Sequence, residues 1–276
     1  EKYKEVAFLD GRSPLVWRQG LKHDASSVME LWRERDGKFR NRLGEIVEVE
    51  EEYVYPFLKG SDLVHDVRRP CRFVIVPQRR LNEDTSELRR KAPKLWAYLN
   101  SHRDVFERRK SAVYKNRPPF SLFGIGEYSF APYKVAVSGL YKKPKFRAIG
   151  PMGGRPVMLD DTCYFLACGS PEEAAFLVSL LNDELCLKFI SSVSFPDAKR
   201  PLTKEILQRV DLGALYRCID RKALVARAKK ELIRLGAGKG RRDWEKIAKR
   251  VLGGSERVAQ IKLFPREIKE GLSAGC

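Results

Sequence analysis

The segment from Val157 to Phe189 constrains the fold more than any other part of the chain. Its first half, VMLDDTCYFLACG, is rich in apolar residues and predicts a buried β-strand. Ser170 comes next and Glu173 stands three residues later, which is the capping-box signature of a helix start. Pro171 at the first helical position agrees with that start, because proline has no N–H to leave unpaired there. The leucine-rich run that follows predicts a helix to about Phe189 with a buried apolar face.

Strands and helices alternate over the earlier part of the chain as well. Arg72–Pro77, RFVIVP, is a β-branched run between turn residues and predicts another buried strand. A long helix is predicted from about Thr85 to Lys110, divided by Pro93, since proline removes a donor and crowds the preceding turn. From Asp220 onward the sequence predicts two or three basic amphipathic helices. We therefore expect an α+β fold, a mixed sheet with packed helices, followed by a mainly helical C-terminal region.

The change in composition suggests a domain boundary near residue 215. Residues 1–215 are expected to form the main domain and residues 216–276 a basic helical C-terminal region. The six cysteines contain no CxxC pair and the three histidines are far apart in the sequence. We therefore expect reduced thiols and no metal site.

The charge of the chain indicates a polyanionic partner. Lys and Arg number 54 against 36 Asp and Glu, which gives a formal net charge of +18. An excess of this size favours nucleic acid, with a membrane surface, an acidic protein or solubility alone as alternatives. The sequence has no apolar run of about 18 residues, so we expect no transmembrane helix. Its first residues have no secretory pattern, and we expect a cytoplasmic protein.

The segment from Lys115 to Gly150 combines aromatic rings with cations and contains a single acidic residue, Glu127. Phosphates attract Lys and Arg, and sugars or bases can lie against aromatic rings. A nucleic acid is the partner that this combination favours. The alternative is a pair of strands with ordinary lysines on the solvent side.

Two short motifs in this segment are similar to catalytic motifs but depart from them. Asn116–Phe120, NRPPF, is similar to the polar-Pro-Pro-aromatic loop of enzymes that methylate base amines, but Arg117 separates the asparagine from the prolines. Phe123–Gly126, FGIG, lacks the strand, helix and following acidic residue of a cofactor-binding glycine loop. We assign no catalytic residue, and whether this chain has enzymatic activity of its own stays open.

Several short motifs, taken in order, resemble the C-terminal target-recognition part of the large N6-adenine DNA methyltransferases of Type II restriction-modification systems, including those fused to nucleases. Each motif is short, and the resemblance depends on their order over residues 12–215. The motifs are Trp17–Lys22 (WRQGLK), Val54–Leu63 (VYPFLKGSDL), Leu95–Leu99 (LWAYL), Phe120–Phe123 (FSLF), Tyr141–Arg147 (YKKPKFR), Asp160–Tyr164 (DDTCY) and Leu180–Asn182 (LLN).

The resemblance implies a module that recognises a specific sequence of double-stranded DNA for a methyltransferase. The motifs for the methyl donor and the target adenine are missing here, so S-adenosylmethionine is expected in an associated catalytic domain, in cis or in trans, and no cofactor in this chain. Residues 216–276 have no counterpart in the family. The alternatives are a complete DNA-modifying enzyme with diverged motifs, and a subunit that docks an acidic protein through its basic C-terminal helices.

Charge clustering and the resemblance together give a set of predicted DNA-binding residues. Phosphate contacts are expected from basic side chains, base contacts from three further cations, and groove contacts from four rings. The predicted phosphate contacts are Arg79, Arg80, Arg109, Lys110, Lys142, Lys143 and Lys145, within a basic surface that also holds Lys115. The predicted base contacts are Arg117, Lys134 and Arg147, and the predicted rings are Phe120, Phe123, Tyr128 and Tyr141.

Overall fold

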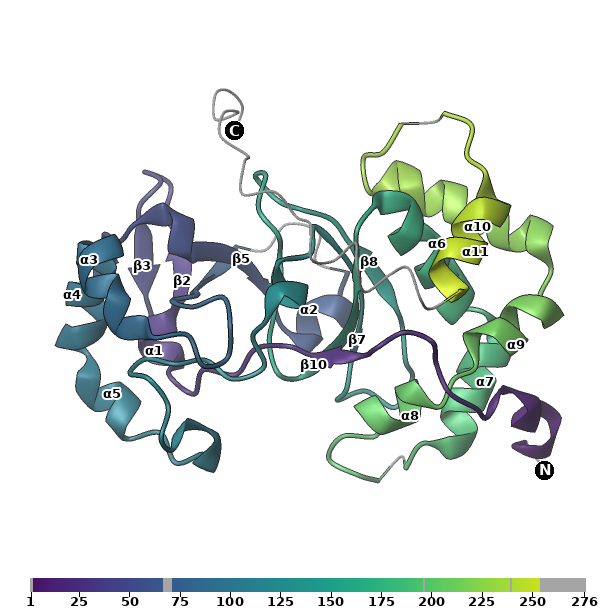
Figure 1. Cartoon of the computed structure of the whole chain (residues 1–276), viewed down its shortest axis with the longest axis horizontal. Coiled ribbons are helices and arrows are strands. Elements are labelled where there is room, and N and C mark those ends of the chain that lie inside the picture. Colours follow the sequence, from purple (N-terminus) through teal and green to yellow (C-terminus); the bar gives the residue numbers. More distant parts are fainter. Residues whose placement is uncertain (1, 67–70, 196, 239, 254–276) are drawn as a thin grey trace.

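The computed structural model describes residues 2–66, 71–195, 197–238 and 240–253. The molecule is elongated, with a sheet-and-helix lobe at one end, a helical lobe at the other and a second sheet between them (Figure 1). This arrangement confirms the α+β class and the helical C-terminal region. The end of the predicted C-terminal region, residues 254–276, lies outside the described residues.

The first lobe is built on a six-stranded sheet with the order β4-β3-β2-β6-β5-β9. Its strands are antiparallel except for the β5–β9 pair, which is parallel. The strands are β2 Glu30–Arg33, β3 Phe39–Asn41, β4 Ile46–Val47, β5 Val54–Leu58, β6 Arg72–Ile75 and β9 Met158–Leu159. The strand predicted at Arg72–Pro77 is confirmed as β6.

Short helices complete the core of this lobe. The α-helices are α1 Ser26–Met29, α3 Leu88–Lys91, α4 Pro93–Ser101 and α5 Arg103–Glu107, and the 3-10 turns are η2 Glu51–Tyr53, η3 Thr85–Glu87 and η4 Ala112–Tyr114. The long helix predicted over this region is therefore divided, and Pro93 is the first residue of α4. The Glu50 side chain caps the N-terminus of α4, because its carboxylate accepts hydrogen bonds from the Lys94 and Leu95 amides at 3.0 and 2.8 Å.

The central sheet has the order β1-β10-β7-β8 and is antiparallel throughout. Its strands are β1 Arg18–Gln19, β7 Tyr133–Ser138, β8 Arg147–Ile149 and β10 Cys163–Cys168. Side chains such as Val135 and Leu166 face the helical lobe, whereas Ala136 and Phe165 form a separate cluster with Leu63 of the short helix α2, Gly60–Val64. Both faces are thus covered, and β7 is a central strand rather than a surface strand.

The helical lobe is organised around α6, whose residues from Glu173 to Leu181 are all buried. Its helices are α6 Pro171–Leu181, α7 Glu184–Val193, α8 Lys204–Gln208, α9 Leu212–Cys218, α10 Arg221–Arg234 and α11 Trp244–Leu252, with the N-terminal turn η1 Lys4–Leu9 beside them. The predicted cap is confirmed, since the Ser170 hydroxyl accepts from the Glu173 amide at 3.2 Å. The predicted helix is two helices, because Asp183 starts α7 in the same way.

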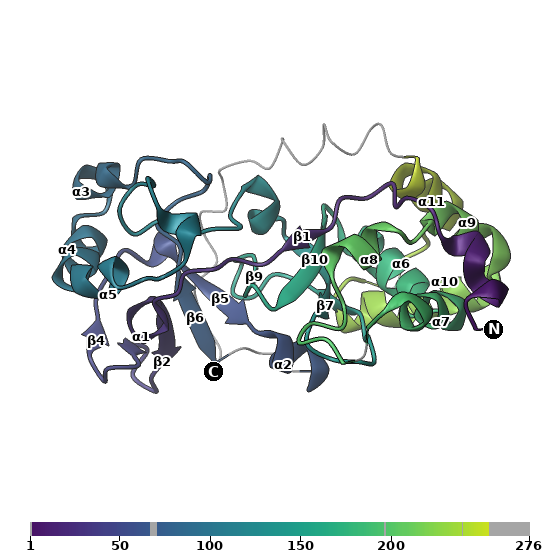
Figure 2. The same ribbon diagram turned by 90° about the horizontal axis from the view of Figure 1, so that it is seen from below.

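The regions on the two sides of residue 215 share one hydrophobic core. Leu177 and Leu180 of α6 belong to the same buried cluster as Leu224 of α10 and Val251 of α11. The domain boundary itself stays a prediction. The segment before β1 starts in this lobe and the segment after β1 enters the other, so that one extended stretch of chain links them (Figure 2).

Candidate nucleic-acid interface

The loop after β6 holds Arg79 and Arg80 in a fixed backbone conformation. The buried Gln78 side chain donates to the carbonyls of Arg80 and Leu81 at 2.7 and 3.1 Å, and its oxygen accepts from the Leu122 amide. The Glu83 carboxylate accepts from the amides of Arg79 and Arg80 at 2.7 and 3.1 Å. The Gln78 and Glu83 side chains thus shape the loop through its backbone and leave both guanidinium groups to make contacts of their own.

The two guanidinium groups meet at the 3-10 turn η5, Glu127–Phe130. Arg79 Nη2 lies 3.2 Å from one Glu127 oxygen and Arg80 Nε lies 3.6 Å from the other. The Arg79 guanidinium also stacks on Phe130, with Cζ 3.9 Å from the ring centroid. The Arg79 and Arg80 side chains remain 51% and 78% exposed, so both can reach a partner.

Two further arginines stack on rings beside this turn. Arg18 of β1 lies over Tyr128 at 4.5 Å, and Arg155 lies over Tyr55 at 5.7 Å and donates to the Val54 carbonyl. Tyr55 in turn packs edge-on against Phe130, with centroids 5.5 Å apart. Burial raises the pKa of both tyrosines, so their rings stay neutral beside the cations.

Arg117 joins the same surface from the loop before η5. Its Nε donates to the Val113 carbonyl at 2.6 Å, its Nη1 donates to Asn82 in the loop that carries Arg80, and its guanidinium lies 5.7 Å from the Phe123 ring. We call this set the arginine–aromatic surface. Its members are Arg18, Arg79, Arg80, Arg117 and Arg155, the rings Tyr55, Phe123, Tyr128 and Phe130, and Glu127.

Arg18 and Arg155 were not among the predicted DNA contacts. Arg18 lies in one of the motifs that carry the resemblance, but the sequence does not show that it faces Tyr128. Arg155 follows Gly153 and Gly154, whose φ angles of +54° and +71° form the tight turn between Met152 and Arg155. The Gly-Gly pair is the sequence signal from which a tight turn next to a cation could have been predicted.

Two of the predicted contact residues have buried side chains in the structure. Phe120 is 1% exposed and packs edge-on against Trp96 and Phe106. Lys134 is also 1% exposed, because β7 is a central strand, and its Nζ donates to the Ala131 carbonyl at 2.8 Å. Burial lowers the pKa of Lys134 to about 7.

Two predicted arginines hold loops together in the described structure. The Arg109 guanidinium lies 3.8 Å from the Tyr114 ring centroid and donates to the carbonyls of Ser121 and His23. Burial lowers the pKa of Arg109. Arg147 donates to the Leu63 carbonyl at 3.1 Å and pairs with Asp66 at 3.3 Å. Both side chains are half-buried and bonded to neighbouring loops, so less of each guanidinium is open to a DNA partner than of Arg79 or Arg80.

The remaining predicted residues form separate exposed groups. Lys110 and Lys115 are exposed on either side of η4. Tyr141, Lys142, Lys143 and Lys145 lie in the loop between β7 and β8, where Lys142 lies 3.7 Å from Asp197. The structure therefore brings Arg79, Arg80, Arg117, Phe123 and Tyr128 together and places the lysine loop elsewhere.

The described ranges contain neither a metal cluster nor a membrane-spanning helix. No group of three or more His, Cys, Asp or Glu side chains in residues 2–253, outside the gaps, is placed to hold a metal ion. Within the same ranges no helix is both long enough and apolar enough to cross a bilayer. The interface described above consists of charge, rings and backbone carbonyls.

Comparisons with known proteins show that part of this chain is similar to part of a Type II methyltransferase. No family model matches the chain. The Type IIL restriction-modification enzyme MmeI, solved in complex with DNA, aligns with a TM-score of 0.45 and 11% identity over 91% of this chain and 35% of that one, which is too low to indicate a shared fold. The Type II methyltransferase M.NspV of Nostoc sp. (strain ATCC 29411 / PCC 7524) is 45% identical over 209 residues. That match covers 75% of this chain and 43% of the relative, so the chain is similar to less than half of a Type II methyltransferase.

Proposed function

We propose that this chain is a target-recognition module that binds duplex DNA selectively and positions an adenine for an N6-methyltransferase domain located elsewhere, in cis or in trans. The observation that carries the proposal is the arginine–aromatic surface. Five guanidinium groups converge there and one carboxylate, Glu127, pairs with two of them. The similarity to M.NspV supports a role in methylation. The proposal places the methyl donor, S-adenosylmethionine, in the associated domain.

The geometry of the surface suits base recognition as well as phosphate binding. A guanidinium that lies over a ring is held in place, so little conformational entropy is lost when its N–H groups that are not paired with Glu127 bind a partner. Those N–H groups match the O6 and N7 acceptors of guanine in the major groove. We assign this role first to Arg79, which is stacked on Phe130 and still half exposed.

The proposal is tested by replacing Arg79 and Arg80 together with glutamine in the full chain. A duplex sequence is first enriched by binding of the wild-type chain from a random library. The affinities of wild type and variant for this enriched duplex and for a mixed-sequence duplex are then measured by fluorescence anisotropy. Because one good bidentate contact contributes about 1–3 kcal/mol, the enriched duplex should bind at least about tenfold more weakly to the variant.

A matched control comes from the β2–β3 hairpin. Arg33 stacks on Phe39 at 5.6 Å and Arg35 is exposed beside it, so replacing both with glutamine removes the same charge from another surface. The control should keep nearly full affinity. Equal losses in both variants, or a wild-type chain without salt-dependent duplex binding, would contradict the proposal. If calorimetry showed that this chain alone binds S-adenosylmethionine, the result would instead favour a complete DNA-modifying enzyme.

A further inference from the structure

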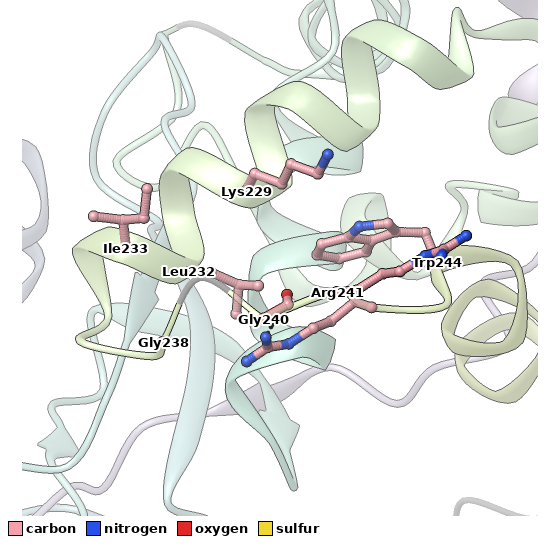
Figure 3. Close-up of a pocket in the computed structure, with 8 residues that line it drawn as sticks. Lys229, Leu232, Ile233, Gly238, Gly240, Arg241 and Trp244 are labelled. Carbon is pink, nitrogen blue, oxygen red and sulfur yellow. Dashed lines mark hydrogen bonds between the residues drawn. The ribbon is translucent and has the colours of Figure 1, made fainter.

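A second site lies in the helical lobe, between the end of α10 and the start of α11. An open pocket of about 540 Å³ is bounded there by one turn of α10, the connecting loop and the first residue of α11. In Figure 3, Lys229 lies above the indole of Trp244 and Leu232 lies beside it, with Gly240 and Arg241 on the loop that closes the other side. The pocket therefore has an apolar wall and cationic edges.

The wall of the pocket is fixed by packing on α6. Leu232 is 4% exposed and forms a cluster with Ala175 and Ala228, and the partly buried Trp244 packs against the same cluster. Arg242 ties the loop to α6, since its Nε lies 3.1 Å from a Glu172 oxygen. The indole is thus held in place while the space in front of it stays open.

The carboxylates of this region are already engaged. Glu231 pairs with Arg234 at 2.7 Å and Glu245 with Arg221 at 3.3 Å. Asp220 accepts hydrogen bonds from the Lys222 and Ala223 amides in the first turn of α10, and Asp243 accepts one from the Lys246 amide in the first turn of α11. In the described part of the chain, no carboxylate lies within ion-pair distance of Lys229 or Arg241. These two cations are available to an anion.

We propose that this pocket binds the sugar–phosphate backbone of one DNA strand outside the recognised sequence. Lys229 and Arg241 would bind phosphate, and the apolar face of a deoxyribose would lie on Trp244 and Leu232. In an intact duplex the bases are stacked inside, so the backbone is the part that such a pocket can meet. Among the described residues, none has an atom within 4 Å of a Cβ atom placed at Gly238, so the chain is not packed against them at that position.

The inference rests on the proposed function, and the experiment separates the two. Binding of a mixed-sequence duplex of about 30 base pairs is measured against salt concentration for the full chain. Replacing Lys229 and Arg241 with glutamine should make the slope of log affinity against log salt less steep by about 1.8, at about 0.9 for each phosphate lost. The matched control replaces Lys246 and Lys249, two exposed cations of α11, with glutamine, and should change the slope less.

Trp244 supplies an independent readout. Duplex binding should change tryptophan emission in the wild-type chain, and Trp244→Phe, which keeps an aromatic ring in the wall, should lose most of that change. If the variant without Lys229 and Arg241 showed the same salt slope as the wild type, the inference would be overturned. If that variant also lost binding to polyglutamate, the occupant of the pocket would be an acidic protein instead of DNA. If the salt slope were unchanged but the variant without Arg79 and Arg80 still bound the enriched duplex more weakly, only the pocket inference would fail and the proposed function would be retained.

Discussion

The Arg79 guanidinium lies over the Phe130 ring, with Cζ 3.9 Å from the ring centroid, at the edge of a turn whose first residue, Glu127, pairs with the same arginine. Ring and carboxylate together fix the plane and the direction of one cation that is still half exposed. An arginine held in this way binds a bidentate acceptor with less ordering than a mobile side chain requires. The relation therefore predicts that affinity and selectivity depend on different atoms of this surface.

Replacing Glu127 with glutamine should raise the affinity for mixed-sequence DNA and lower the preference for the enriched sequence. The first effect follows from the removal of a negative charge close to phosphates. The second follows because Arg79 and Arg80 lose the carboxylate that orients them, and a lost bidentate contact costs about 1–3 kcal/mol in discrimination. Both affinities are measured by anisotropy at one salt concentration.

The control for this experiment is Glu34→Gln. Glu34 pairs with Arg40 at 3.1 Å and is 45% exposed, close to the 43% of Glu127. It lies in the β2–β3 hairpin, away from η5. It should leave the preference unchanged. If both variants reduced preference alike, a general effect of surface charge would explain the result and Glu127 would have no orienting role.

Local features of the fold were predictable from the sequence, because they depend on neighbouring residues. Ser170 starts α6 as expected, Pro93 starts α4, and Gly236 follows the end of α10 with a φ angle of +75°. In each case a short side chain or a restricted backbone acts within one helical turn. Such signals do not depend on how the chain is folded elsewhere.

Features that depend on distant segments were missed. Glu50 caps α4 across 44 residues, which no local signature shows. Lys134 was expected on a solvent-facing strand, but β10 and β8 pair with β7 on its two sides and α2 covers the face on which Lys134 lies. The convergence of Arg18, Arg79 and Arg155 likewise requires strand β1 and two loops from different parts of the chain.

The buried Lys134 should make the protein more stable as the pH rises above neutrality. Its folded pKa is about 7 against 10.5 when exposed, because burial disfavours the charged form. Between these values the unfolded chain holds a proton that the folded chain lacks, so the free energy of unfolding rises with pH, by at most about 1.4 kcal/mol per pH unit. Urea unfolding from pH 7 to pH 10 measures this rise.

Lys134→Met should be more stable than the wild type at pH 7 and should lose that pH-dependent rise. Lys115→Met, which removes an exposed lysine, gives the reference for the other groups that titrate in this range. A wild-type curve that matched the Lys134→Met curve would show that Lys134 keeps its proton in the folded chain.

Glu30 is expected to stabilise the first lobe at neutral pH and to lose that effect in acid. It is 1% exposed, and Lys59 Nζ lies 2.6 Å and His23 Nε2 3.4 Å from its Oε1. Burial acts to raise the pKa of Glu30, but the hydrogen bonds from His23 and Lys59 outweigh it and lower the pKa to about 2. The stabilisation is therefore complete above pH 4.5, the ordinary pKa, and disappears as the pH falls toward 2.

Glu30→Gln should lower the free energy of unfolding at pH 7 by about 2–3 kcal/mol. Breaking a fully buried ion pair costs more, but Lys59 is 28% exposed and regains some water. The difference between wild type and variant, measured by urea unfolding, should shrink at pH 3. Glu34→Gln, just after the other end of β2, serves as the exposed reference. A difference that did not depend on pH would contradict the role of the Glu30 charge.

The loop between β7 and β8 should contribute affinity without selectivity. Lys142, Lys143 and Lys145 are exposed and lie apart from the arginine–aromatic surface, so they can neutralise phosphates of any sequence. Replacing all three with glutamine should reduce the salt slope by up to about 2.7, at about 0.9 for each phosphate, with the sequence preference unchanged. If about six phosphates are contacted in total, the wild-type slope should be near −5.

Arg117→Ala provides the opposite case. Arg117 is anchored to the Val113 carbonyl and to Asn82 beside the Arg80 loop, so its loss should relax preference more than it changes the slope. The two variants are compared on the enriched duplex and on the mixed-sequence duplex over the same salt range. Because phosphate contacts are blind to sequence whereas base contacts are not, a lysine-loop variant with altered preference would show that this loop enters a groove. The base contacts that give sequence preference would then come from the β7–β8 loop and not from the surface at η5.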